Sequence, residues 1–191
     1  MHKGRLEAFS DGMIAIFITV MVLEFKVPRG GELADLRPLI PQVLCYVLSF
    51  LYLGIYWNNH HHLFQAVKHV DGRTLWANLH LLFWLSLVPF TTAWMGENHF
   101  APVPVAVYGV VLLGAGTAYF ILTLALIALH GRDSFIARAL GRDIKGKLSL
   151  AIYALAIIAA CKLPWLACGL YLLVALIWLV PDTRIEKKLA E

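Results

Sequence analysis

Long stretches that carry almost no charge constrain this chain more than any other feature of its sequence. Lys162 is the only Lys, Arg, Asp or Glu within residues 39–59, 75–96, 101–129 and 148–181. An apolar helix of about 20 residues, at a rise of about 1.5 Å per residue, crosses the roughly 30 Å hydrocarbon core of a bilayer. Only 15% of the 191 residues are charged, whereas a soluble domain averages about a quarter. The sequence therefore predicts an all-α membrane protein.

Proline, glycine and charged turns divide these stretches into six predicted transmembrane helices. Pro28 and the pair Gly30–Gly31 end the first, a charged turn at 68–73 ends the second, and Pro164 separates the last two. Pro89 lies inside the third helix and should kink it. We expect a single six-helix transmembrane domain over residues 1–191, with helices at about 5–27, 37–67, 74–95, 105–129, 148–163 and 165–180.

The basic residues indicate how this layout is oriented. With six spans, twelve of the sixteen Lys and Arg residues lie on the side of the two termini, and four lie on the opposite side. Basic loops stay in the cytoplasm, so both termini are predicted to be cytoplasmic in a multi-pass protein of the inner (plasma) membrane. The net charge of +4 follows from this topology. No basic stripe interleaved with aromatic residues is present, so a nucleic-acid partner is not expected.

The first helix is the unusual element, because charges flank it and one face carries a mixed stripe. Ile16, Thr19, Val20 and Leu23 stand at spacings of three, four and seven residues, which places them on one face. Gly12 lies on the same face one turn earlier. Branched apolar side chains interrupted by one hydroxyl suit the lining of a pore. The same spacing also suits a packing seam against another helix, and the spacing leaves both interpretations open.

Several segments resemble one family of membrane proteins. Arg5, Phe9, Ser10 and Asp11 reproduce the R-x-x-x-F-S-D signature that begins the first helix of the lysosomal potassium channel family, transmembrane protein 175. Three further segments are also similar to that family, so that the resemblance covers roughly residues 5–181. They are Thr19–Leu23, the Tyr56-Trp57-x-x-His60-His61 segment, and the segment from Asn78 through Ser86 to Pro89-Phe90.

The resemblance implies a potassium-permeable channel that is a homotetramer, with the first helix of each subunit around a central pore in the lipid bilayer. Position by position, Ile16 matches an apolar constriction that acts as a gate, and Leu23 matches a second apolar ring. Val20 would line the pore with them. Thr19 matches a hydroxyl layer tied to selectivity. Ala15 stands where animal members can have a serine, which favours only a modest preference for potassium over sodium.

The charged and polar residues at the start of the first helix should bind partners on other helices. Arg5 and Asp11 are six residues apart, roughly 240° around a helix, so they cannot pair on one face. The polar ends of the second and third helices lie on the same predicted side. We therefore expect a network between helices that fixes the first one. Its expected members are Arg5, Phe9, Ser10, Asp11, His60, His61 and Asn78.

Three other classes of function compete with a channel. A metal-dependent enzyme is disfavoured, because the adjacent histidines His60, His61 and His62 point about 100° apart and no H-x-x-x-H or H-E-x-x-H motif accompanies them. Neither a metal nor another cofactor is expected. A secondary transporter or proton-coupled carrier is the main alternative, although such folds usually have repeated halves and broken helices. A structural subunit without transport activity also stays open.

Overall fold

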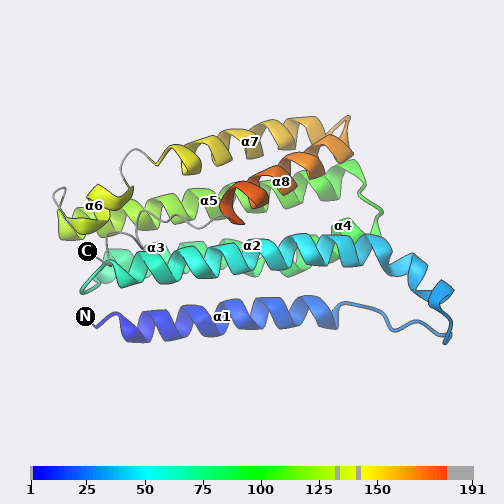
Figure 1. Cartoon of the computed structure of the whole chain (residues 1–191), viewed down its shortest axis with the longest axis horizontal. Coiled ribbons are helices and arrows are strands. Elements are labelled where there is room, and N and C mark those ends of the chain that lie inside the picture. The colour runs from blue at the N-terminus through cyan, green and yellow to red at the C-terminus, as the bar shows by residue number, and fades with distance from the viewer. Residues whose placement is uncertain (1, 132–133, 141–142, 180–191) are drawn as a thin grey trace.

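The computed structural model describes residues 2–131, 134–140 and 143–179, which form helices and contain no strand. In chain order these are α1 (Gly4–Leu23), the 3-10 helix η1 (Leu33–Leu39), α2 (Ile40–Gln65), α3 (Gly72–Ser86), α4 (Val88–Glu97), α5 (Pro102–His130), α6 (Phe135–Leu140), α7 (Ile144–Ala160) and α8 (Pro164–Leu179). All helices except η1 and the short α6 run along the long axis of the bundle, and successive segments return along it (Figure 1).

Helix α5 occupies the centre of the bundle, where α3, α4, α7 and α8 all pack against it. Its small residues permit these close contacts. A Cβ atom added to Gly114 would lie 2.3 Å from the ring of Trp84 on α3, so a larger residue would push these two helices apart. The small Ala115 and Ala118 on the same helix are fully buried. This packing keeps α7 and α8 on one side of α5 and α1 on the other (Figure 1).

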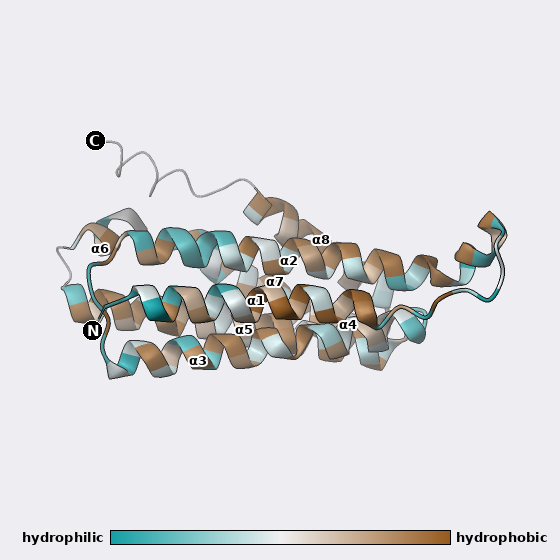
Figure 2. Ribbon diagram, turned by 90° about the horizontal axis from the view of Figure 1, so that it is seen from below, coloured by the Kyte–Doolittle hydropathy of each residue, from teal (hydrophilic) through white to brown (hydrophobic). Residues whose placement is uncertain are grey.

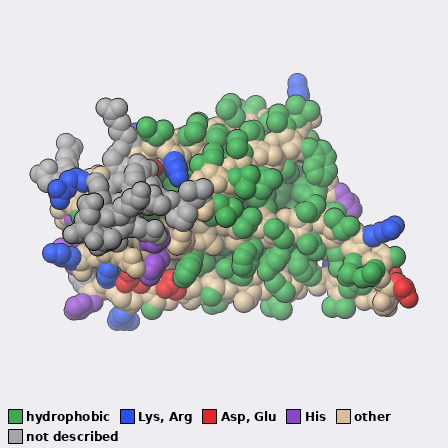
Figure 3. Space-filling view, in the orientation of Figure 1, with side chains coloured by type: hydrophobic (Ala, Val, Ile, Leu, Met, Phe, Trp, Pro, Cys, Tyr) green, Lys and Arg blue, Asp and Glu red, His purple; other side chains and the backbone are tan. Residues whose placement is uncertain are grey.

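Hydrophobic side chains cover the middle of the bundle, and charged side chains gather at its two ends (Figure 3). Four segments of the described chain are long and apolar enough to cross a membrane. They are Gly4–Leu23, Leu33–Gln65, Gly72–Glu97 and Pro102–His130, and α8 is a shorter apolar helix. The chain is therefore a multi-pass membrane protein built from helices. The total of six spans and the cytoplasmic side of the termini stay predictions.

The first helix ends at Leu23, one turn before the predicted end at residue 27. Residue 27 precedes Pro28, and a residue before proline disfavours the helical conformation. The released segment makes contacts of its own. The ring of Phe25 packs edge-on against Tyr46 at 5.4 Å between centroids, and Lys26 Nζ lies 2.8 Å from Glu97 Oε1. The 20 residues of α1 still provide about 30 Å of helix.

Prolines also change the bounds of the second and third predicted helices. The segment predicted to start at residue 37 is a 3-10 helix that contains Pro38, and α2 proper starts at Ile40 with Pro41 in its first turn. The third predicted helix, 74–95, begins earlier, at Gly72, because the Asp71 side chain caps it by accepting from the Thr74 backbone N–H. It is broken at Leu87, and Pro89 lies in the first turn of α4.

The predicted linker over residues 130–147 contains α6 and the first turn of α7. Helix α7 starts at Ile144, one turn before the predicted residue 148, because the carboxylate of Asp143 accepts from the Gly146 backbone N–H. It ends at Ala160, and α8 starts at Pro164. Residue 180 of the last predicted helix lies outside the described residues, as do Arg132, Arg142 and the charged tail.

Candidate functional site

Helix α1 lies on the outer face of the bundle rather than in its interior. It rests against α2, α3 and α4, and seen from below it runs in front of the bundle between α2 and the α3–α4 pair (Figure 2). One face of α1 is buried against these three helices. It consists of Leu6, Ser10, Ile14, Phe17 and Met21. Their spacing of three or four residues produces a continuous buried stripe. Helix α1 is therefore attached to its own subunit along one side only.

The opposite face of α1 carries the predicted pore-lining residues. Ile16 is 54% exposed and Leu23 is 81% exposed, and Gly12 and Thr19 are exposed with them. At 100° per residue these four positions lie roughly 150° around the helix from the centre of the buried stripe. Val20, predicted to join them, is half-buried at the edge of this face. We call Gly12, Ile16, Thr19 and Leu23 the open stripe of α1.

Thr19 carries the hydroxyl group of the open stripe, and this hydroxyl already donates its proton in a hydrogen bond. Its Oγ1 donates to the backbone oxygen of Ile16 at 2.9 Å, within the same helix. A threonine hydroxyl has one donor and two acceptor lone pairs. With the donor turned back onto the helix, Thr19 presents oxygen lone pairs outward. This is the polarity that a cation needs and that a lipid tail does not use.

A buried hydrogen-bonded chain connects three of the predicted network residues. Asn78 Nδ2 on α3 donates to Ser10 Oγ on α1 at 2.9 Å. Asn78 Oδ1 lies 2.8 Å from His60 Nε2 on α2. Because an amide oxygen only accepts, His60 carries its proton on Nε2 in this arrangement. All three side chains are buried, so the chain joins α1, α2 and α3 without access to water.

A second set of contacts joins α1 to α2 nearer the surface. Trp57 Nε1 on α2 donates to Asp11 Oδ1 at 3.0 Å. The Trp57 ring also stacks on His61, with 6.1 Å between centroids and an interplanar angle of 17°. His61 in turn bonds to the Gln65 side-chain amide at 2.8 Å. Asp11 and His61 therefore lie in one group, separate from the Ser10–Asn78–His60 chain.

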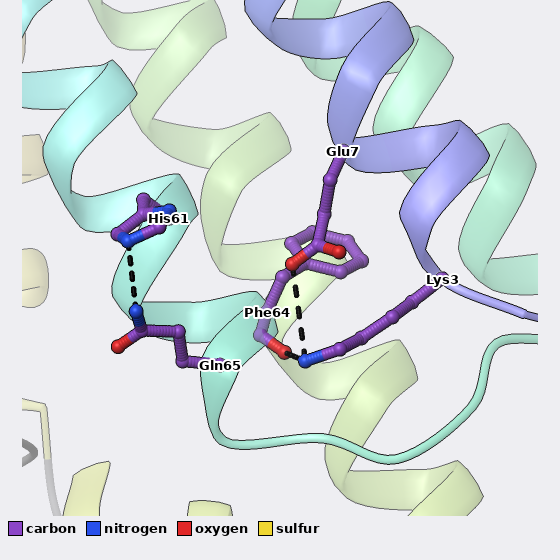
Figure 4. A network of polar contacts seen from close by, with 5 residues as sticks. All are labelled: Lys3, Glu7, His61, Phe64 and Gln65. Atoms are coloured by element: carbon purple, nitrogen blue, oxygen red, sulfur yellow. Dashed lines mark hydrogen bonds and ion pairs between the residues drawn. The ribbon is translucent and has the colours of Figure 1, made fainter.

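The start of α1 is tied to the end of α2 by Lys3 (Figure 4). Lys3 Nζ donates to the backbone oxygen of Phe64 and lies 3.8 Å from Glu7 Oε1. Arg5 and Phe9, predicted to belong to the network, are both exposed. Among the described residues neither joins the hydrogen-bonded groups.

Sequence reasoning did not identify Lys3, Trp57 or the Lys26–Glu97 pair as groups that hold α1. Trp57 lies in a segment that resembles the family, but its hydrogen bond depends on which face of α2 meets α1. Lys26 and Glu97 are 71 residues apart, so no local spacing indicates that they meet. The hydrogen bond that Lys26 donates to the Glu97 carboxylate raises the pKa of Lys26.

Comparisons with known proteins agree on one family. Residues 5–89 match the family described as the endosomal/lysosomal potassium channel TMEM175. A potassium channel of Chryseobacterium sp. is 56% identical over 191 residues, which is the full length of both chains. A potassium channel of Streptomyces collinus is 40% identical over 126 residues, covering 62% of this chain and 61% of that one.

A vertebrate relative and a solved structure extend the similarity. The endosomal/lysosomal proton channel TMEM175 of Danio rerio is 30% identical over 132 residues, or 66% of this chain and 24% of that longer protein. The crystal structure of a lysosomal potassium-selective channel TMEM175 homolog from Chamaesiphon minutus matches with a TM-score of 0.81 and 29% identity. This match covers 94% of this chain and 97% of that one.

Proposed function

The chain belongs to the TMEM175 family of potassium channels, and we propose that it forms a cation pore lined by the open stripe of α1 from several copies. The exposed stripe is the observation that carries this proposal. A helix held along only one side leaves its other side for a partner or for water. The bacterial relatives are named potassium channels, which makes K⁺ the ion that we propose to pass.

Ile16 is the proposed gate. Symmetry-related copies of α1 would bring their Ile16 side chains together in an apolar ring, and such a ring closes a pore by expelling water. A small rotation or splay of α1 would rewet it. Leu23 would form a second apolar ring two turns further along, with Val20 at the edge of the pore between the two rings.

Thr19 is the proposed selectivity residue, one turn from the Ile16 ring. Because its hydroxyl donates to its own helix, its lone pairs can replace part of the hydration shell of an ion. A ring of hydroxyls carries no formal charge, so binding stays weak enough for release. Ala15 adds no further oxygen beside the gate, and we propose a modest preference for K⁺ over Na⁺.

We propose a homotetramer in the inner membrane with both termini in the cytoplasm. Four open stripes around one axis would enclose a narrow path, and the groove formed by α2, α3 and α4 would hold each α1 from outside. The excess of basic residues on the side of the termini supports this orientation. In this orientation the Ser10–Asn78–His60 chain lies toward the cytoplasmic end, where it would fix the angle of α1.

Potassium flux into liposomes tests the gate. The purified parent protein is compared with Ile16→Asn and with Ile158→Asn, the same substitution at an exposed position of α7. We expect the parent to conduct K⁺, Ile16→Asn to conduct at least several-fold faster, and Ile158→Asn to match the parent. Equal flux in Ile16→Asn and the parent, with both proteins equally folded, would remove Ile16 from the gate.

A second candidate ion is the proton, because the zebrafish relative is named a proton channel. The same liposomes with a pH-sensitive dye inside distinguish the two ions. A K⁺ gradient that drives proton entry only when valinomycin is added indicates a proton path without K⁺ flux. Flux that saturates with K⁺ and requires a second coupled ion would instead support the carrier.

A further inference from the structure

A cavity lies between α2, α5, α7 and α8. The space between these helices is about 540 Å³, a figure that includes the open mouth. It follows α7 from Asp143 to Tyr153, a length of roughly 15 Å. It is separate from the open stripe, and nothing in the proposed pore requires it.

The inner walls of the cavity are aromatic, and their polar atoms already have partners. Tyr52 donates its hydroxyl to the backbone oxygen of Tyr171 at 2.6 Å. Trp178 Nε1 donates to Ser149 Oγ at 2.8 Å. Phe120 and Tyr153 complete this part of the wall. The inner part therefore presents ring faces and offers little hydrogen bonding to a ligand.

The other end of the cavity, where α7 begins, has three oxygen atoms that can accept. Tyr56 is only 8% exposed, and its hydroxyl makes no hydrogen bond to another described residue. Asn59 Nδ2 donates to the Ile55 backbone oxygen at 2.8 Å, which leaves Asn59 Oδ1 as an acceptor. Asp143 Oδ1 accepts from Gly146 N at 3.2 Å, and its second oxygen remains.

We propose that this cavity binds a primary amine with an apolar body, its ammonium group at Tyr56, Asn59 and Asp143. An ammonium group has three N–H donors and carries a positive charge, which matches three oxygens that include one carboxylate. The aromatic rings suit the apolar body, and their faces attract cations as well. One such contact is present within the protein, since Lys145 Nζ lies over the Trp178 ring, 5.8 Å from its centroid.

The charge at the mouth separates this ligand from other amphiphiles. The carboxylate of Asp143 would repel a fatty acid or a phosphate monoester, and an alcohol would satisfy fewer of the three oxygens. Two sources supply the proposed chemistry, namely a free alkylamine and a membrane lipid with a primary ammonium head, such as phosphatidylethanolamine. Both would place ammonium at Asp143 and an apolar chain toward Trp178.

Native mass spectrometry of the purified full-length protein tests the site with decylamine, decanol and decanoate as probes. We expect one decylamine per subunit, bound at least tenfold more tightly than decanol or decanoate. A second readout uses 10-bromodecylamine, because bromine quenches tryptophan fluorescence on contact. Quenching in the parent should be reduced in Trp178→Phe, which retains an aromatic ring in the wall.

Asp143→Asn is the sharpest variant, because asparagine caps a helix as well as aspartate does and tolerates the left-handed backbone of residue 143, where φ is 40°. The substitution removes the charge and the free acceptor oxygen but keeps an oxygen for the cap. The matched control is Asp71→Asn, at the N-cap of α3 and away from the cavity. We expect decylamine affinity to fall at least tenfold in Asp143→Asn, to fall several-fold in Tyr56→Phe, and to be unchanged in Asp71→Asn.

Equal affinity for decylamine and decanol, or unchanged affinity in Asp143→Asn, would overturn the proposal. Comparison of phosphatidylethanolamine with phosphatidylglycerol then identifies the source. If the protein retains phosphatidylethanolamine but not phosphatidylglycerol, and Asp143→Asn loses the bound phosphatidylethanolamine, the proposal is supported with a lipid as the ligand. Binding of decylamine without a preference between these lipids supports it with a free amine as the ligand.

Discussion

At the scale of single residues, Thr19 has the most specific chemistry on α1. Its hydroxyl proton is held by the Ile16 backbone oxygen, and its exposed position leaves the oxygen facing away from the subunit. Ile16 and Leu23 on the same stripe offer no polar atom. Any ion that passed along this stripe would therefore meet one level of oxygen between two apolar levels.

Thr19→Val should reduce the preference for K⁺ over Na⁺ several-fold, because valine has the same shape but no oxygen. The free energy of unfolding should change little, since the side chain is exposed in the subunit. Reversal potentials under mixed K⁺ and Na⁺ gradients measure the preference. Thr19→Ser keeps the hydroxyl and serves as the control. Equal permeability ratios in Thr19→Val and the parent would argue against Thr19 as a selectivity residue.

Asn78→Ala should destabilise the protein by about 2–4 kcal/mol, because it leaves two buried polar groups, on Ser10 and His60, without their partner. Thermal unfolding of the purified protein in detergent measures this loss. The control is Asn98→Ala, since Asn98 is exposed and bonds only within its own turn. A melting temperature of Asn78→Ala as high as that of Asn98→Ala would show that the buried chain contributes no stability.

At the scale of the elements, the position of α1 depends on contacts at several points along its length. Lys3 holds its start to the end of α2, Trp57 holds Asp11, and Lys26 after its end reaches Glu97 of α4. Polar contacts therefore fix both ends, whereas the middle of α1 is held by apolar side chains such as Ile14 and Phe17.

Asp11→Ala should impair gating or assembly, because it removes the acceptor of the Trp57 indole N–H that joins α1 to α2. Asp11→Asn keeps an acceptor oxygen at the same place and should retain most activity. Single-channel recording gives the open probability, and size-exclusion chromatography gives the oligomeric state. An Asp11→Ala protein with unchanged assembly and unchanged conductance would contradict this role.

The N-terminal cap of α3 should make stability depend on acidic pH. Hydrogen bonds from the Thr74 backbone N–H and hydroxyl lower the pKa of Asp71. A lowered pKa in the folded state adds stability above the unfolded pKa, about 3.9, and this stability is lost as pH falls through the folded value. The difference in melting temperature between the parent and Asp71→Ala should therefore shrink between pH 6 and pH 3. A constant difference over this range would contradict the assignment.

At the scale of the whole molecule, apolar length and proline positions predicted most of the helices. Pro89 predicted the interruption that divides α3 from α4, and Pro164 predicted the start of α8. Helix ends set by tertiary contacts were missed. Leu23 ends α1 because Phe25 and Lys26 leave the helix for Tyr46 and Glu97, and those partners are distant in sequence.

The candidate site was also predictable only where it depends on local sequence rather than on contacts between helices. Helical spacing placed Ile16, Thr19 and Leu23 on one face, because that face depends only on the geometry of one helix. The partners of Ser10 and Asp11 depend on how α1, α2 and α3 rotate against each other. Residue spacing could place Asn78, His60 and Trp57 at one end of the bundle, but it could not pair them. The cavity between α2 and α7 is likewise a product of packing.

Block by Ag⁺ of a cysteine placed at position 19 tests whether the open stripe of α1 lines the conduction path. Thr19→Cys and the control Leu155→Cys, an exposed position on α7, are made after Cys45, Cys161 and Cys168 are replaced. Potassium flux is measured before and after Ag⁺. We predict that flux falls at least tenfold in Thr19→Cys and is unchanged in Leu155→Cys. Unchanged flux in Thr19→Cys would contradict a pore lined by α1.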